Sequence, residues 1–412
     1  MCAYRVAIVC SHPIQYLAPW FRDLAQHPRL DLTVYYGHDH GLAPGYDPEF
    51  GQRVKWNIDL VGGYRWQLLA NHAPRPGVGR FFGIASGGLW QLLTPEHFDA
   101  VVIQGWNYAL YPMALLAARM HGLPVLLRCE SVRPLHAPPP TAQSVPTLLK
   151  RELVRCYVKS CAAGLAVSAG NRRLLLHYGL PADRIFSSPY AVDAQRFALP
   201  PDTRARHRAA WRQRLGLAAE TPLLLFVGKL IPVKAPELLL TAFAALRRGG
   251  AAAHLCICGD GELRAALVQQ RQELGLTAAD VSFPGFVNQD ELPALYAAGD
   301  ALVLPSLHET FGIVVAEAMH AGLPAVVSEG VGCAEDLVIP GVTGLRFPIG
   351  DSAALAACLA ELCAGPQAHE RRTTLAARAE EWAAGWTYAR ATRGLIQALD
   401  TLDLDREKPG PT

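Results

Sequence analysis

Short apolar runs alternate with helical patterns along nearly the whole chain. An uninterrupted apolar run such as residues 222–228 is typical of a strand that is buried on both faces, whereas residues 112–121 have the spacing of a covering helix. This alternation predicts parallel sheets with helices on both faces. The predicted strands form two series, at residues 5–10, 31–36, 99–104, 123–128 and 163–168 and then at 222–228, 253–258, 281–283, 300–305 and 324–328.

Two series of strands predict an α/β protein with two Rossmann-like, doubly wound domains that face a cleft. Each domain should bind ligands at the carboxyl ends of its strands. The segment 44–88 is rich in Gly, Pro and aromatic residues with weak periodicity, which fits an extended loop or a lid. The expected divisions are an N-terminal domain at 1–198, a linker and lead-in at 199–220, a C-terminal domain at 221–381, a helix at 382–402 and a frayed tail at 403–412.

Composition excludes several other classes of protein. The 412 residues are 51% hydrophobic and 18% charged, which is typical of globular domains with cores of their own. The 38 Lys and Arg residues nearly balance the 36 Asp and Glu residues, so bulk charge gives no case for nucleic-acid binding. Neither a signal-peptide pattern nor a membrane-spanning run is found in the sequence, so we expect a cytoplasmic protein.

The most informative stretch lies at residues 300–322. A strand is followed by a loop that carries Glu309 and then by a helix that begins near Phe311. The N-terminal amides of this helix, with Gly312 allowing close approach, predict a phosphate or diphosphate site. Glu317 lies about one and a half turns further, so the two carboxylates would face different parts of one extended ligand. Considered alone, Glu309 could instead stabilise the helix dipole while Glu317 is an incidental surface residue.

A second cluster follows the first strand of the same domain. Gly228 and Lys229 come directly after this strand, and Lys234 follows in the same loop. Two lysines beside a helix N-terminus can neutralise a departing diphosphate. Two solvated loop lysines are the alternative interpretation.

Together these motifs resemble the donor domain of retaining glycosyltransferases of the GT-B fold, family 4 (glycosyl transferases group 1). Glu309 and Glu317 match the paired-glutamate motif of that family, and Gly228-Lys229-x4-Lys234 matches its Gly-Arg/Lys-x4-Lys motif. The resemblance is dense over about residues 222–350, where three further landmarks occur in the right order: Gly259-Asp260-Gly261, Gly285-Phe286-Val287 and Gly341-Val342-Thr343-Gly344-Leu345.

The resemblance implies transfer of a sugar from a UDP- or GDP-sugar to an acceptor hydroxyl with retention of configuration, without a metal or other cofactor. The acceptor would be a glycan, a lipid-linked molecule or a small molecule. Lys229 and Lys234 would bind the diphosphate, Glu309 would contact the sugar, and Glu317 would hold the ribose hydroxyls. The segment around Trp386 would cross back to the first domain. The implied donor-binding residues are Gly228, Ser306, Phe311, Gly312, Ile313 and Glu317.

The first domain departs from the family pattern in two loops. Where members often have a Gly-rich loop, this chain has Ser11-His12-Pro13-Ile14-Gln15-Tyr16; where many have a His beside the reacting carbon, it has Arg128-Cys129-Glu130-Ser131. Glu130 could be the polar group beside the anomeric centre. The acceptor-side candidates are His12, Gln15, Tyr16 and Arg128, and a structural role for His12 fits equally well.

Two other functions stay open. A nucleotide-sugar epimerase or a glycosyl phosphorylase on the same architecture would convert the donor without an acceptor or would need inorganic phosphate. A non-catalytic nucleotide-sugar-binding protein would bind the donor and transfer nothing, and the missing His is compatible with it.

A basic pattern in the first domain has a less specific meaning. The four cations fall near one helix face, opposite Leu149, Leu153 and Val154, and are Lys150, Arg151, Arg155 and Lys159. A plain solvated face is favoured over weak peripheral contact with anionic lipid at the inner membrane face.

Overall fold

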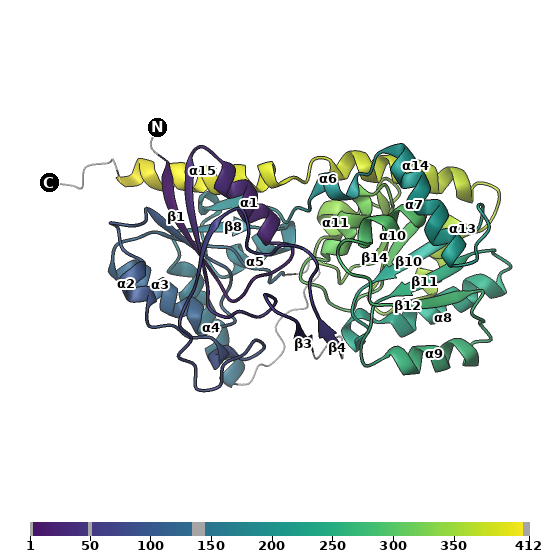
Figure 1. Ribbon diagram of the computed structural model, residues 1–412, viewed down its shortest axis with the longest axis horizontal. Helices are drawn as coiled ribbons and strands as arrows, with labels where there is room; N and C mark the ends of the chain where they lie inside the picture. The colour runs from purple at the N-terminus through teal and green to yellow at the C-terminus, as the bar shows by residue number, and fades with distance from the viewer. Residues whose placement is uncertain (1–2, 48–51, 134–144, 407–412) are drawn as a thin grey trace. The chain divides into compact units, whose positions relative to one another are not determined.

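The computed structural model describes residues 3–47, 52–133 and 145–406. The chain divides into two compact units (Figure 1). Unit 1 comprises Met1–Ala43, Asp59–Ala191 and Tyr388–Thr412, and unit 2 comprises Pro44–Ile58 and Val192–Thr387. Each unit contains one parallel sheet with helices around it, which confirms the predicted fold class.

The sheet of unit 1 has seven parallel strands in the order β5-β2-β1-β6-β7-β8-β9. Strands β1 and β6 are neighbours, and the chain moves outward from them in opposite directions, which is the doubly wound arrangement. The strands are β1 Tyr4–Cys10, β2 Leu30–Tyr36, β5 Arg65–Leu68, β6 Ala100–Ile103, β7 Val125–Leu127, β8 Ala163–Ala166 and β9 Ile185–Ser187.

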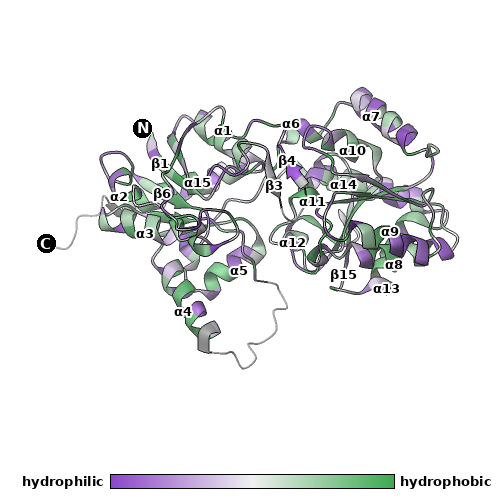
Figure 2. Ribbon diagram, turned by 60° about the horizontal axis from the view of Figure 1, so that its bottom comes forward, coloured by the Kyte–Doolittle hydropathy of each residue, from purple (hydrophilic) through white to green (hydrophobic). Residues whose placement is uncertain are grey.

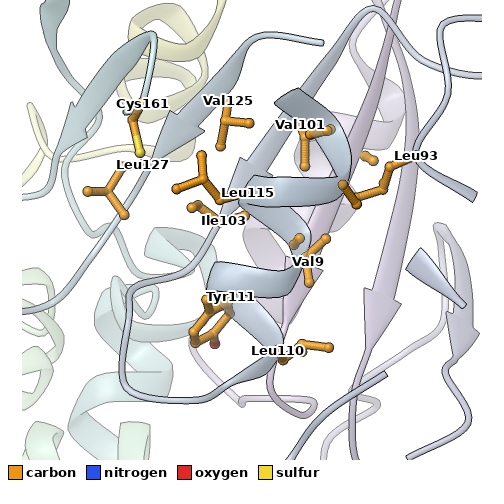
Figure 3. Close-up of a cluster of buried hydrophobic side chains, with 14 of the residues drawn as sticks. Val9, Leu93, Val101, Ile103, Leu110, Tyr111, Leu115, Val125, Leu127 and Cys161 are labelled. Carbon is orange, nitrogen blue, oxygen red and sulfur yellow. The ribbon is translucent and has the colours of Figure 1, made fainter. Parts of the chain in front are cut away.

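The helices of unit 1 bury apolar faces against this sheet. In Figure 3, Leu115 and Tyr111 of α3 lie over Ile103 of β6 and Leu127 of β7, within a larger cluster of buried side chains. The helices are α1 Ala18–Gln26, α2 Leu89–Leu92, α3 Leu110–Met120, α4 Val145–Lys159, α5 Ala169–His177 and α15 Tyr388–Arg406, with short 3₁₀ turns at Phe81–Gly83 and Ala182–Arg184.

The sheet of unit 2 has six parallel strands in the order β12-β11-β10-β13-β14-β15. Its central strands are fully buried, as their uninterrupted apolar sequences predict. The strands are β10 Leu223–Val227, β11 His254–Cys258, β12 Val281–Gly285, β13 Ala301–Leu304, β14 Ala325–Ser328 and β15 Gly344–Phe347.

Helices surround the sheet of unit 2, and apolar (green) and polar (purple) residues both occur along them in Figure 2. They are α6 Ala194–Phe197, α7 Pro201–Arg214, α8 Pro236–Arg248, α9 Arg264–Glu273, α10 Leu292–Ala298, α11 Ile313–His320, α12 Ala334–Leu337, α13 Ser352–Cys363 and α14 Ala368–Ala383, with a 3₁₀ turn at Pro232–Lys234. A two-stranded ribbon, β3 Gly45–Asp47 and β4 Gln52–Val54, also belongs to this unit.

The structural division differs from the expected one within both halves of the sequence. Residues 199–220 contain helix α7, which packs on α10 in unit 2 and is no linker. Arg212 of this helix is buried and forms an ion pair with Asp300 at 3.3 Å, which fixes α7 to the start of β13. The segment Pro44–Ile58 lies within the N-terminal half of the sequence, yet packs in unit 2.

The C-terminal helix α15 runs over Tyr388–Arg406 and belongs to unit 1, beginning and ending later than the expected 382–402. The Tyr4 hydroxyl donates to Asp400 Oδ1 at 2.8 Å, and the Thr392 hydroxyl donates to Asp23 Oδ2 at 2.8 Å. These bonds join the two ends of the sequence in one unit. Of the expected frayed tail, residues 403–406 continue α15 and residues 407–412 lie outside the described part.

Candidate functional site

The carboxyl edge of the unit 2 sheet has a switch point between β10 and β13. In open α/β sheets, ligands bind at such a switch point, where the chain leaves two neighbouring strands in opposite directions. The amide of Leu307, after β13, donates to the carbonyl of Val233, after β10, at 2.8 Å. The two loops that carry the predicted donor motifs are therefore joined directly.

Lys234 and Glu309 meet at this switch point. The ammonium of Lys234 forms an ion pair and hydrogen bond with Oε2 of Glu309, and both side chains are mostly buried. The Ser306 hydroxyl lies 3.5 Å from the same carboxylate oxygen. Ala235, directly after Lys234, has φ of 48° and is the one non-glycine residue with positive φ in the described part of the chain. Such strain persists where the surrounding structure fixes it, as at functional sites.

The Glu309 loop is held by a second loop through its backbone. The Glu309 amide donates to the Gly330 carbonyl at 2.9 Å, and the Gly332 amide donates to the Glu309 carbonyl at 3.0 Å. A Cβ at Gly332 would lie 2.1 Å from the carbonyl oxygen of Thr310, so only glycine permits this approach. The position of Glu309 is thus fixed by main-chain contacts on both sides.

Helix α11 begins beside this loop. Gly312 occupies the N-cap position with φ of 89°, and the buried Phe311 ring anchors the loop before it. The helix begins at Ile313, slightly later than expected. Its N-terminus presents amide donors and a partial positive charge at the edge where Lys234 lies.

Glu317 lies in the interior of unit 2. Its side chain is only 6% exposed, and its Oε2 accepts a hydrogen bond from the Tyr296 hydroxyl of α10 at 2.9 Å. Burial raises the pKa of Glu317, while the Tyr296 bond and the charge of Arg196 oppose that rise. The alternative of an incidental surface residue is therefore wrong.

The loop with Gly228 and Lys229 is packed against the next strand. The Gly228 amide donates to the Cys258 carbonyl at 3.0 Å, and the Gly259 amide donates to the Gly285 carbonyl at 2.9 Å. A Cβ at Gly259 would lie 1.8 Å from the Gly228 oxygen. The ends of β10, β11 and β12 are thereby held together as a continuous edge.

An aromatic pair that the sequence did not predict lies beyond the end of β12. The Trp56 and Phe286 rings are 6.2 Å apart, and Asn288 Nδ2 donates to the Lys55 carbonyl at 2.8 Å. Trp56 belongs to the segment that joins unit 2 from the N-terminal half. Only the aromatic content of residues 44–88 signalled this contact.

The carboxyl edge of unit 1 carries Glu130 in a different setting. The hydroxyls of Tyr16 and Tyr190 both donate to Oε1 of Glu130, at 2.5 and 2.8 Å. Burial and the Glu130 charge raise the pKa of Tyr16 and Tyr190, so both phenols keep their protons. Tyr16 and Glu130 were predicted on this edge, whereas Tyr190, which follows β9, was not.

Arg128 lies between two aromatic rings. Its guanidinium carbon is 4.3 Å from the centroid of Trp20 and 4.3 Å from that of Tyr190. The side chain is 1% exposed, and among the described residues its Nε and Nη1 have no hydrogen-bond partner. Cation–π contacts therefore hold this charge in place, and Tyr190 links it to Glu130.

His12 lies among other histidines at the ends of β1 and β2. Its ring is 5.2 Å from that of His40, its Nδ1 lies 3.0 Å from the Ser11 hydroxyl, and His38 is next to His40. Burial, with the charges of His40 and His38, lowers the pKa of His12 to about 3. His12 is thus neutral at physiological pH, while Gln15 is half-buried in the same loop.

Sequence comparison assigns the chain to a family. Residues 207–382 match the model of "Glycosyl transferases group 1". A D-inositol 3-phosphate glycosyltransferase of Frankia alni is 32% identical over 314 residues, which cover 74% of each chain. The chain therefore belongs to the glycosyl transferases group 1 family. A D-inositol 3-phosphate glycosyltransferase of Nocardia farcinica is 35% identical over 234 residues. This match spans about half (49%) of that relative's length.

Solved structures show the same architecture. The crystal structure of Anabaena Alr3699/HepE in complex with UDP superposes with a TM-score of 0.70 at 19% identity, covering 96% of this chain and 100% of that chain. The fold of this chain is thus that of a GT-B-type protein. None of the helices in the described part is both long and apolar enough to cross a membrane.

Proposed function

We propose that this protein is a retaining glycosyltransferase of the family 4 type that moves a sugar from a nucleotide-diphospho-sugar to an acceptor hydroxyl. The observation that carries the proposal is the Lys234–Glu309 pair at the switch point of unit 2, beside the N-terminus of α11. A diphosphate there would replace Glu309 as the partner of Lys234. The freed carboxylate would then be available to the sugar hydroxyls.

The rest of the donor would extend along the carboxyl edge. Strands in a sheet lie about 4.8 Å apart, so the end of β12 lies roughly 10 Å from that of β10. A nucleoside attached to a diphosphate at β10 would reach Phe286 and Trp56, whose rings offer a surface for its base. We propose a UDP- or GDP-sugar as the donor, with Glu317 holding the ribose hydroxyls and Tyr296 orienting that carboxylate.

Stabilisation of the leaving group would come from the chain itself. In the proposed reaction the bond from the anomeric carbon to the diphosphate oxygen breaks, and its electron pair stays on the diphosphate. The acceptor oxygen bonds to the same face of that carbon, and its proton passes to a diphosphate oxygen. Lys234, Lys229 and the α11 amides would stabilise the growing charge, so we propose that no metal is required.

On the acceptor side we propose that Glu130 replaces the histidine of other family members. Its Oε1 already accepts hydrogen bonds from two tyrosine hydroxyls, so Oε2 would accept a hydrogen bond from the acceptor hydroxyl. Arg128, fixed between its two rings, would hold Tyr190 and thereby the position of the Glu130 carboxylate. The acceptor class is left as a glycan, a lipid-linked molecule or a small molecule.

A panel of UDP- and GDP-sugars tests this function. Purified protein is incubated with each donor and with EDTA, first without acceptor and then with pooled small glycans, and released nucleoside diphosphate is measured. We expect slow release from one donor, faster release with acceptor, and a product anomer of the donor's configuration by NMR. Conversion of the donor sugar to its epimer, a requirement for phosphate, or binding with no release would instead support one of the two alternative functions. Full loss of activity with EDTA, reversed by metal, would contradict the metal-free mechanism.

A further inference from the structure

Helix α4 of unit 1 exposes large apolar side chains to solvent. Leu149 is 61% exposed and Leu153 is 63% exposed. Cys156, one helical turn further on the same side, is also exposed. The helix instead packs inward through Val158, Val154 and Tyr157.

Helix α3 continues this surface. The right-handed crossovers from β6 to β7 and from β7 to β8 put α3 and α4 side by side on one face of the sheet (Figure 1). Arg119 Nη1 donates to the Ser160 carbonyl at 3.2 Å, which joins the C-terminal ends of the two helices. On α3, Leu116 is 54% exposed and Met120 is 70% exposed, four residues apart on its outer side. We call Leu116, Met120, Leu149, Leu153 and Cys156 the α3–α4 apolar face.

Basic side chains border the apolar face. On a helical wheel, Lys150 lies on one side of the Leu149–Leu153 stripe, and Arg155 and Lys159 lie on the other. The one carboxylate of α4, Glu152, lies 3.4 Å from Arg151 and 3.8 Å from Arg155, so its charge is compensated locally.

An exposed apolar stripe flanked by cations, here Lys150 on one side and Arg155 and Lys159 on the other, is the pattern of a helix that lies in the plane of a membrane interface. Soluble monomeric proteins rarely leave such a patch uncovered. The cations match the negative charge of anionic lipid headgroups, and long basic side chains can extend toward the headgroups while the leucines reach the acyl region. A solvated face would explain the cations and would leave the leucines unexplained.

We propose that the α3–α4 apolar face is a peripheral membrane-binding surface for anionic lipid bilayers, with Leu149 and Leu153 inserted at the headgroup–acyl boundary. This inference does not depend on the proposed sugar transfer, because none of these residues belongs to either carboxyl edge.

Flotation of the full-length protein with lipid vesicles tests the proposal. Vesicles of phosphatidylcholine with about 40 mol% phosphatidylglycerol are compared with pure phosphatidylcholine vesicles, at low and high salt. We expect binding to the anionic vesicles, at least tenfold weaker binding to the neutral ones, and weakening by salt. The double variant Leu149→Ser/Leu153→Ser should reduce binding at least tenfold, and Lys150→Gln/Arg155→Gln should reduce it by about fivefold per charge removed.

A matched control separates this face from exposed apolar residues in general. Ile349, in a loop of unit 2, is 51% exposed, and Ile349→Ser should bind vesicles like the wild type. A polarity-sensitive dye on Cys156, in a Cys2→Ser background, should shift to the blue with anionic vesicles, because the other described cysteines are buried or half-buried. Circular dichroism and donor-hydrolysis rates without vesicles should be unchanged in the leucine variant.

Three outcomes would overturn the proposal. The first is the absence of vesicle binding by the wild-type protein. The second is a leucine variant that binds as well as the wild type. The third is self-association through this face, seen as a dimer in light scattering that dissociates in the leucine variant while vesicle binding is absent.

Discussion

The carboxyl edges of the two units are built in different ways. In unit 2 the loops after the strands are held by main-chain hydrogen bonds and by glycines such as Gly259 and Gly332, where a Cβ would collide with a neighbouring carbonyl. In unit 1 the edge is held by large side chains, with Arg128 between two rings and Glu130 between two tyrosine hydroxyls. This difference fits the proposed division of work, in which backbone groups and cations of unit 2 bind the charged donor and the side-chain network of unit 1 binds the acceptor.

The largest effect on activity is expected when the charged pair Lys234–Glu309 of unit 2 is removed. Lys234→Ala and Glu309→Gln should each lower turnover by roughly 10²–10³-fold, as the loss of one preorganised electrostatic group does in other enzymes. Turnover is measured as release of nucleoside diphosphate at saturating donor. The exposed Glu220→Gln in the same unit is the control and should keep full activity.

The role of unit 1 is tested by Glu130→Gln. A hydrogen bond to a charged group contributes about 1.5–3 kcal/mol, so the variant should lower kcat/KM for the acceptor by roughly 10–100-fold. Donor affinity should be unchanged, because Glu130 lies in the other unit. Tyr190→Phe should give a smaller loss in the same parameter. An equal loss of donor affinity in Glu130→Gln would show that the two edges do not divide the work as proposed.

Trp56 tests where the base of the donor binds. It comes from the N-terminal half of the sequence, yet it packs on Phe286 in unit 2. Stacking of a base on an aromatic ring is worth about 1–3 kcal/mol, so Trp56→Ala should weaken UDP or GDP binding by about tenfold or more. Isothermal titration gives the affinities. Trp382→Ala, which removes another partly exposed indole of unit 2, is the matched control. Unchanged affinity in Trp56→Ala would place the base elsewhere.

The last prediction concerns stability rather than activity, and it rests on the buried His12 of unit 1. The folded pKa of His12 is lowered to about 3, whereas an unfolded histidine titrates near 6.5. The unfolded chain therefore binds an extra proton below pH 6.5. The free energy of unfolding should decrease by about 1.4 kcal/mol for each unit by which the pH is lowered, until the folded pKa is reached. Urea unfolding at several pH values should show a shallower fall in His12→Asn. Parallel curves for both proteins would contradict burial of a neutral His12.

The sequence predicted the central strands and the unit 2 motifs because both depend on local patterns. Strands β10 and β11 are continuous apolar runs, and the spacing of Gly228, Lys234 and Glu309 follows from loops that glycines hold in one conformation. Strand β5 was not predicted, because all four of its residues are exposed at the edge of the sheet and form no apolar run.

The remaining features depend on contacts between distant parts of the sequence. Tyr190 reaches Glu130 only because β9 and β7 are near neighbours in the sheet. Trp56 reaches Phe286 because the chain between β2 and β5 joins unit 2. Helix α7 is polar and rich in arginine, so its sequence has little apolar periodicity, and it is anchored by Arg208 and Arg212 on Asp300. Such tertiary contacts leave no local signal.

The most direct test of the central claim compares nucleoside diphosphate with nucleoside monophosphate. Affinities of UDP, UMP, GDP and GMP are measured by titration for the wild type and for Lys234→Ala. If the switch point of unit 2 binds the diphosphate, the wild type should bind one diphosphate at least tenfold more tightly than its monophosphate, and this difference should largely disappear in Lys234→Ala. Equal affinities for both nucleotides in the wild type, or a difference that survives in Lys234→Ala, would contradict the account.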